Sequence, residues 1–188
     1  AIPIGFLIMT HQAMPEFASD IAVWNAAIEA YPASPAVWDN RGLAYAAQEN
    51  LDAALSDFSA AIACDPHFHK ASVHRGDIFA FRGDNRAALD EYDRAIAACT
   101  QRAAYFRKRA DILFSLDRVE EARVDYSRAL ELDPADAIAV HNRGMCSARL
   151  ADYAAAYEDV SRALALNPRY YEAYLARGHI LRAMGKMK

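Results

Sequence analysis

The sequence is poor in cysteine, in positive charge and in β-strand patterns, and these shortages exclude several classes of protein. Its 188 residues include three cysteines, Cys64, Cys99 and Cys146, and no C-x-x-C pair. This odd, widely spaced set argues against a disulfide framework or a thiolate zinc site, so we expect buried, reduced thiols in a cytoplasmic protein. The formal net charge is -4 at pH 7, whereas phosphate recognition needs clustered positive surface. Nucleic acid is therefore not an expected partner.

Catalytic and metal-binding signatures are missing as well. The chain has no G-x-S-x-G elbow, no phosphate-binding P-loop and no G-x-G-x-x-G. His67, His69 and His74 are close in sequence, but the first two fall in a predicted turn and the third lies more than a helical turn further on. A metal site needs three or four converging ligands. The sequence therefore predicts neither an enzyme, nor a cofactor, nor a metal centre.

Long apolar runs are also lacking. A membrane-spanning helix needs about 20 apolar residues. The apolar stretch at residues 1–9 (AIPIGFLIM) is far shorter, and it lacks the positive segment that begins a signal peptide. We interpret it as an apolar arm that must be covered by something.

What the chain does have is a strict period. An arginine followed by a small residue recurs every 34 residues, at Arg41-Gly42, Arg75-Gly76, Arg109-Ala110, Arg143-Gly144 and Arg177-Gly178. Proline follows the same interval at Pro32, Pro66, Pro134 and Pro168, with Thr100 in the third place. A repeat of this length predicts stacked helical hairpins, in which each unit buries surface against its neighbours.

Each repeat is predicted to hold two helices. In the first full repeat, apolar residues recur at spacings of three and four over 35–48 and 51–64. Ser34 should cap the first helix and Pro35 should begin it. We predict a degenerate first repeat over 1–34 that includes the apolar arm, four full repeats over 35–170 (35–68, 69–102, 103–136 and 137–170), and a C-terminal half-repeat helix over 171–188.

Small and aromatic residues hold fixed positions in these repeats. Glycine inside a helix costs about 1 kcal/mol against alanine, so its recurrence implies close approach of the paired helix. Residues 35–68 carry Trp38, Gly42, Tyr45, Ala54, Phe58, Ala61 and Pro66. This pattern resembles the tetratricopeptide repeat, well over 35–184 and more weakly over 17–34. The resemblance implies an all-α, right-handed superhelical solenoid of antiparallel helix hairpins. Departures at Ser72, Thr100, Ser147 and Val160 predict looser packing there.

The arginine row has two interpretations. Each repeat places an acid near the middle of its second helix, at Asp57, Glu91, Asp125 and Asp159. The favoured interpretation is an intramolecular ladder of arginine–carboxylate pairs. The alternative is a row of anion receptors for a partner.

The resemblance implies that a partner binds on the concave face, which the first helices form. At the matching positions this chain has Asp39, Asn40, Leu43, His74, Asp77, Phe81, Arg107, Lys108, Asp111, Phe114, His141, Asn142, Met145 and Arg149, with His179 and Arg182 beyond them. Phe81 and Phe114 are the expected anchors, and Asn40, Asn142 and Arg107 would fix the register of a bound segment. An ordinary solvated helix face is the alternative.

One branch of the family clamps a C-terminal carboxylate with Lys, Asn and Arg on successive first helices. Arg107 and Asn142 fit that clamp loosely, but Asp111 stands where Asn is wanted and Glu172 where Lys is wanted. Because a carboxylate there would repel the ligand, we do not expect this role.

The expected function is a non-enzymatic scaffold that binds a peptide or helix of another protein. Two alternatives stay open. The first is a self-assembling structural protein. Tyr174, Leu181 and Met184 would leave an apolar stripe uncovered after Gly178, so either the chain is a piece of a longer repeat array or another molecule covers the stripe. Head-to-tail contacts between chains would cover it. The second is an accessory interaction domain of a larger protein.

Overall fold

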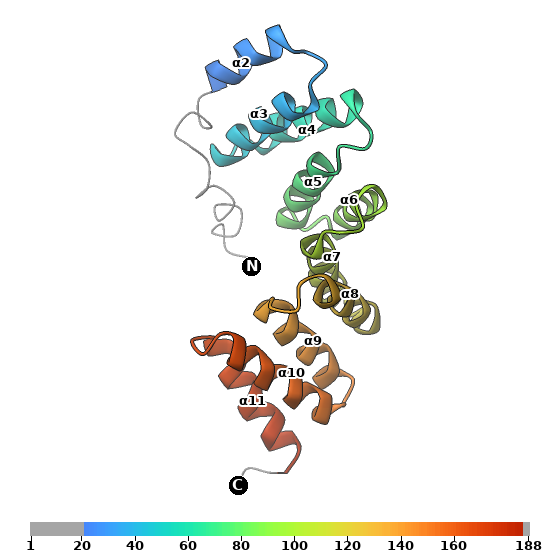
Figure 1. The fold of residues 1–188 in the computed structure, drawn as a ribbon, viewed down its shortest axis with the longest axis vertical. Helices are drawn as coiled ribbons and strands as arrows, with labels where there is room; N and C mark the ends of the chain where they lie inside the picture. Colours follow the sequence, from blue (N-terminus) through green and yellow to red (C-terminus); the bar gives the residue numbers. More distant parts are fainter. Residues whose placement is uncertain (1–20, 186–188) are drawn as a thin grey trace. The chain divides into compact units, whose positions relative to one another are not determined.

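The computed structural model describes residues 21–185, and the apolar arm predicted over residues 1–9 lies outside this range. The described part is entirely helical, with no strand among these residues, and it forms two compact units that divide after Thr100 (Figure 1). The first unit holds α2 (Ile21–Ala30), α3 (Pro35–Ala47), α4 (Leu51–Cys64), α5 (His69–Phe81) and α6 (Asn85–Ala98). The second unit holds α7 (Ala103–Ser115), α8 (Val119–Leu132), α9 (Ala137–Arg149), α10 (Tyr153–Leu166) and α11 (Tyr171–Ala183). None of the described helices is both long and apolar enough to cross a bilayer.

Each predicted repeat is a helix hairpin. Helix α3 packs on α4, α5 on α6, α7 on α8 and α9 on α10. Within a unit, each hairpin also packs on the next through α4 with α5, α8 with α9 and α10 with α11. The prediction of an all-α stack of hairpins is confirmed. Helix α2 packs on α3, at the place predicted for the second half of the degenerate first repeat; residues 1–20 are not described.

The turn between paired helices has the same backbone geometry throughout. Glu49, Asp117 and Ala151 all have φ between 61° and 64°, and Gly83 at the same position has φ 80°. A left-handed residue at the end of a helix stops it and satisfies its last carbonyls. The next helix begins two residues later. The side chains of the N-cap residues Asn50, Asp84 and Asp152 each accept a hydrogen bond from the backbone amide three residues further on. Because the turn repeats, every hairpin closes in the same way.

One predicted cap is only half right. Ser34 is the N-cap residue of α3 and Pro35 is its first helical residue. The Ser34 side chain accepts no cap hydrogen bond, however, and its backbone carbonyl accepts one from the amide of Val37 at 3.2 Å. Proline has no amide to donate at the first position, so the backbone turn suffices there.

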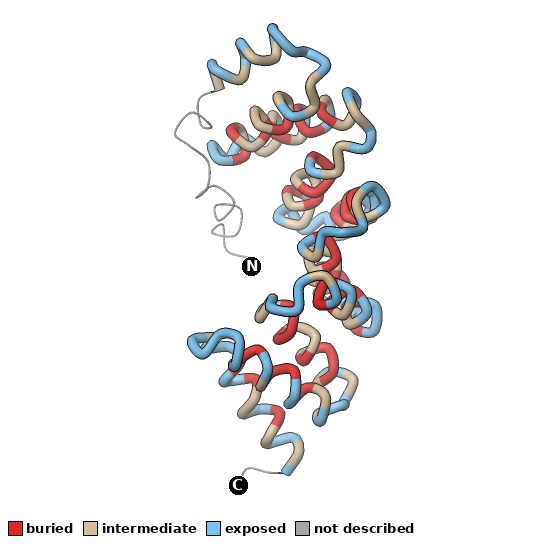
Figure 2. Tube along the Cα trace, viewed as in Figure 1, coloured by how far each residue is buried: buried red, intermediate tan, exposed pale blue. Residues whose placement is uncertain are grey.

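Close approach of the paired helices explains the recurring glycines. A Cβ atom added to Gly42 would lie 2.5 Å from the Phe58 ring, and one added to Gly144 would lie 3.1 Å from Val160. These positions form the seam of each hairpin, where the buried residues gather (Figure 2).

The predicted looser packing is wrong at three of its four positions. Ser72, Ser147 and Val160 are all nearly or fully buried, with at most 3% of their surface exposed. Smaller side chains do not open a gap there, because the facing helices stay in contact across them. Thr100 lies exposed in a turn and bears on no helix seam.

Candidate functional site

The arginine row is bound within the hairpins. Arg41 donates two hydrogen bonds of 2.7 Å to the Asp57 carboxylate, and Arg109 does the same to Asp125. Arg143 donates to Asp159 at 2.8 and 2.6 Å, and Arg75 lies 3.0 Å from Glu91. These bonds raise the pKa of the Arg41 and Arg143 guanidinium groups, and all four acids are buried. The ladder interpretation is confirmed, so these four arginines are not available to a partner.

The predicted partner-binding residues differ in how much of them reaches solvent. Asp39 and His141 are buried, whereas Phe81 and Arg149 are exposed. The others are half-buried: Asn40, Leu43, His74, Asp77, Arg107, Lys108, Asp111, Phe114, Asn142 and Met145. Four of the predicted residues form polar contacts between neighbouring first helices, Asp39 with His74 and Asp111 with Asn142.

In the first unit, one such contact links α3 to α5. His74 Nδ1 lies 2.8 Å from the Asp39 carboxylate, and its ring packs against Phe58 at a centroid distance of 5.3 Å. On the same helix, Asp77 accepts a hydrogen bond of 2.9 Å from the Tyr92 hydroxyl. Phe81, the last residue of α5, has 44% of its surface exposed to solvent. This unit therefore offers one apolar anchor beside polar groups that already have partners.

In the second unit, Asp111 is the centre of a larger network. Its carboxylate accepts hydrogen bonds from the Tyr126 hydroxyl at 2.6 Å and from Asn142 Nδ2 at 3.1 Å. Although 36% of the Asp111 side chain reaches solvent, burial of the carboxylate raises its pKa, and the two hydrogen bonds act in the opposite direction. The network ties α7 to its own hairpin partner α8 and to the next first helix α9.

Arg107 lies beside this network, and not all of its N–H donors are hydrogen-bonded. Its Nε atom is 2.9 Å from an Asp136 oxygen and its Nη1 atom is 3.8 Å from an Asp111 oxygen. Neither nitrogen has a partner in hydrogen-bond geometry, although both are buried. Nearby, the Arg149 guanidinium covers the ring of Phe114 at 5.3 Å and pairs with Asp117. Phe114 is therefore shielded on one face, which weakens it as an anchor.

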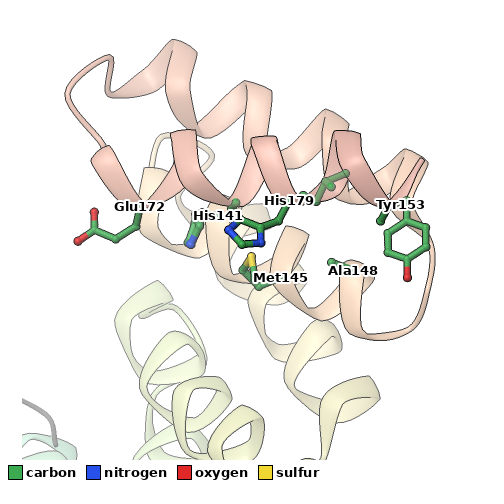
Figure 3. Close-up of a pocket in the computed structure, with 9 residues that line it drawn as sticks. His141, Met145, Ala148, Tyr153, Glu172 and His179 are labelled. Atoms are coloured by element: carbon green, nitrogen blue, oxygen red, sulfur yellow. The ribbon is translucent and has the colours of Figure 1, made fainter. Parts of the chain in front are cut away.

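A pocket of about 540 Å³ lies between α9, α11 and the start of α10. Its walls are mostly apolar: Met145, Ala148, Ala176, Ile180 and Ala183. Glu172 stands at one end and Tyr153 at the other, with His141 and His179 between them (Figure 3). Pockets that are apolar with a few convergent polar groups are typical ligand sites.

His141 is the buried polar group of this pocket. Only 8% of it is exposed, its ring packs against Tyr170 at 4.9 Å, and its Nδ1 atom has no hydrogen-bond partner. Burial lowers the pKa of His141 below its ordinary value, so the imidazole is neutral at pH 7.

The pocket combines predicted and unpredicted residues. His141 and Met145 belong to the predicted face, and His179 continues it. The sequence pattern did not predict that Tyr126, Asp136 and Tyr170 contact residues of that face. A signal for the first of these was present, because Asp77 and Tyr92 have the same separation of 15 residues as Asp111 and Tyr126.

The cysteines only partly follow the prediction. All three are free thiols, but Cys64 is exposed and Cys99 is half-buried, so only Cys146 is buried. Burial raises the pKa of Cys146 to about 12, which makes it an inert thiol. In residues 21–185, no three His, Cys, Asp or Glu side chains come close enough together to hold a metal ion.

Comparison with known proteins agrees with the repeat pattern. Residues 35–68 match the family model described as tetratricopeptide repeat, and residues 110–145 match a second model described as TPR repeat. No curated protein sequence matches the chain.

Solved structures of similar fold cover most of the chain. YrrB, described as a TPR protein with an unusual peptide-binding site, has a TM-score of 0.81 and 20% identity, covering 90% of this chain and 87% of its own. PilF of Pseudomonas aeruginosa has a TM-score of 0.72 and 23% identity, with coverages of 81% and 69%. The first TPR of Spaghetti (RPAP3), bound to an HSP90 peptide, has a TM-score of 0.61 and 24% identity, with coverages of 62% and 93%. At these identities the likeness concerns the fold.

Proposed function

Because this chain is a tetratricopeptide repeat protein, we propose that it is a non-enzymatic scaffold that binds an extended or helical segment of another protein on its first helices. The observation that carries the proposal is the pocket between α9 and α11, whose mostly apolar walls include the buried His141. Two of the structures with the same fold are described as having a peptide-binding site or a bound peptide. These support a protein partner without naming it.

The chemistry of the pocket suggests what it would hold. Its walls fit one apolar side chain of the partner, which is the usual anchor of such interfaces. The Glu172 carboxylate would favour a basic group of the partner at that end of the pocket. This is a different preference from the acidic tails that a carboxylate clamp takes.

The network around Asp111 would hold the face ready for binding. Asp111, Tyr126 and Asn142 join three helices through two hydrogen bonds, so their side chains lose little freedom when a partner arrives. Preorganisation of this kind lowers the entropic cost of association. Arg107 lies on α7 beside this network and would supply the register contact there.

Peptide display tests the pocket directly. A random peptide library panned on the intact protein should enrich sequences that share an apolar residue. Ala183 lines the pocket and is exposed, so Ala183→Phe should fill it without disturbing the core and should weaken an enriched peptide by about tenfold or more, equivalent to about 1.4 kcal/mol.

The matched control places the same bulk elsewhere. Ala165 is exposed on α10, outside the pocket, and Ala165→Phe should leave the affinity unchanged. Peptides that bind Ala183→Phe as tightly as the wild type would show that the pocket is not the site.

A further inference from the structure

Five four-residue turns connect α2 to α3, α4 to α5, α6 to α7, α8 to α9 and α10 to α11. In order, they are residues 31–34, 65–68, 99–102, 133–136 and 167–170. In four of them the second residue is proline, which fixes its own backbone φ angle and restricts the residue before it. In the turn at 99–102 the second residue is Thr100. This turn therefore lacks the rigid residue that the other four share.

The same four turns are also closed by a backbone hydrogen bond, which the amide of the fourth residue donates to the carbonyl of the first. These bonds join Ser34 to Tyr31 at 3.1 Å, Phe68 to Asp65 at 3.0 Å, Asp136 to Asp133 at 3.4 Å and Tyr170 to Asn167 at 3.1 Å. The corresponding residues of the remaining turn are Arg102 and Cys99, and within the described chain they form no such bond. The turn at 99–102 is therefore open where the others are closed.

Three of the turns are held by a side chain as well. The Oδ1 atoms of Asp65, Asp133 and Asn167 each accept a hydrogen bond of 2.9 to 3.1 Å from the backbone amide two residues further on. This side-chain bond mimics a backbone turn and holds the bend. Cys99 has the equivalent position in the turn at 99–102, and its thiol is only a weak acceptor.

Neighbouring helices add further contacts to the proline-containing turns. Trp38 donates a hydrogen bond to the carbonyl of Pro32 at 2.8 Å, Arg162 to that of Pro134 at 2.6 Å, and Tyr174 to that of Pro168 at 3.3 Å. No side chain in residues 21–185 donates to the carbonyl of Thr100. The connection between α6 and α7 is thus the least braced of the five, and the division between the two units falls within it.

We propose that residues 99–102 are a hinge at which the first and second units change their relative orientation. Hinges are short connections whose backbone dihedral angles absorb such motion. Without proline and without closing hydrogen bonds, these four residues can change their dihedral angles at a lower free-energy cost than the other turns. The hairpins on both sides stay intact, because α5 packs on α6 and α7 packs on α8. The hinge does not depend on what the pocket of the second unit binds.

Limited digestion with trypsin tests the hinge, because two contrasting turns each contain an exposed arginine. Arg102 lies in the unbraced turn, and Arg169 lies in the braced turn between α10 and α11. Cleavage of a native protein tracks the population of its locally opened form. Within residues 21–185, trypsin should therefore cut the intact protein first after Arg102 and release the two units as separate fragments. A first cut after Arg169, or equal rates after both arginines, overturns the proposal.

Exchanging the turn residues should exchange the cleavage rates. Cys99→Asp with Thr100→Pro gives the hinge the Asp-Pro pair that begins the turns at 65–68 and 133–136, and cleavage after the arginine of the hinge should slow about fivefold or more. Asn167→Cys with Pro168→Thr removes the brace from the other turn, and cleavage after its arginine should accelerate about fivefold or more. Circular dichroism checks that both variants keep their helices. Unchanged rates in the two folded variants overturn the proposal.

Distances between spin labels distinguish motion of whole units from fraying of the turn alone. One label is attached to the exposed Cys64 of the first unit and the other to Ala165→Cys of the second, in a Cys99→Ala background; Cys146 is buried and unreactive. The control pair, Cys64 with Arg86→Cys, lies within the first unit. Pulsed electron resonance should give a wider distance distribution between the units than for the control pair, and the Asp-Pro variant of the hinge should narrow it. Equal widths for the two pairs overturn the proposal.

Discussion

Helices α9 and α11 lie one repeat apart in sequence and share their arginine–glycine pair, yet within residues 21–185 only the pair of α9 is covered by a second helix. Gly144 on α9 faces Asp159, Val160 and the carbonyl of Ala156, all within 3.2 Å of where its Cβ atom would be. Gly178 on α11 faces open space. The same dipeptide is therefore part of a packed seam in α9, whereas none of the described residues packs against the glycine in α11. What distinguishes them is the helix packed alongside, not the residues themselves.

The largest effect expected from this comparison concerns the two arginines. Arg143→Gln leaves the Asp159 carboxylate buried without its charged partner, and we expect a loss of about 2 to 3 kcal/mol in the free energy of unfolding. Arg177→Gln breaks no ion pair among the described residues and should change stability by less than about 0.5 kcal/mol. Urea unfolding followed by circular dichroism measures both. Equal losses in the two variants would contradict the difference between the helices.

Alanine substitutions of Gly42 and Gly178 should change the stability of the protein in opposite directions. Gly42→Ala forces the buried Phe58 ring away from a contact of 2.5 Å and should cost about 2 kcal/mol through overpacking. Gly178→Ala has room and replaces a poor helix former with the best one, so it should stabilise the protein by up to about 1 kcal/mol. Thermal unfolding of the two variants in one buffer compares them. A destabilised Gly178→Ala variant would show that the seam of α11 is already filled.

The parts of the fold that depend on local pattern could be predicted from the sequence. The predicted helix over 51–64 matches α4 residue for residue, and that over 35–48 exceeds α3 by one residue. The ladder could be predicted because its arginines and its acids recur with the same period. A pairing that forms in one hairpin is therefore expected in all four. The repeat period determines which face of a helix a residue occupies, and this is sufficient to predict the arginine–carboxylate contacts.

Contacts between successive repeats could not be predicted in the same way. The Asp39–His74 contact and the Arg107–Asp136 pair join residues of different repeats that have no counterparts elsewhere in the chain. Their formation depends on the angle and distance between hairpins, which a hydrophobic pattern does not specify. For the same reason the burial of Asp39 and His141 and the pocket beside α11 were not foreseen.

The smallest expected effect is on the pH dependence of stability, which should depend on the buried His141 of α9 and not on the exposed His179 of α11. His141 on α9 is buried under Tyr170, and this burial lowers its pKa below 6.5, although Glu172 acts in the opposite direction. In the unfolded chain the imidazole titrates near 6.5, so below that pH the unfolded state binds more protons than the folded state. Stability should therefore be lost as the pH falls through about 6.5.

Replacing the imidazole ring tests whether His141 causes this loss of stability at low pH. His141→Gln should flatten this part of the stability profile between pH 7 and about pH 5, measured as the urea midpoint at each pH. His179 is exposed on α11, and His179→Gln should leave the profile as it is in the wild type. If His179→Gln flattened the profile and His141→Gln did not, the titrating group would lie on the open helix, and the covering of α9 by α11 would have no part in the pH response.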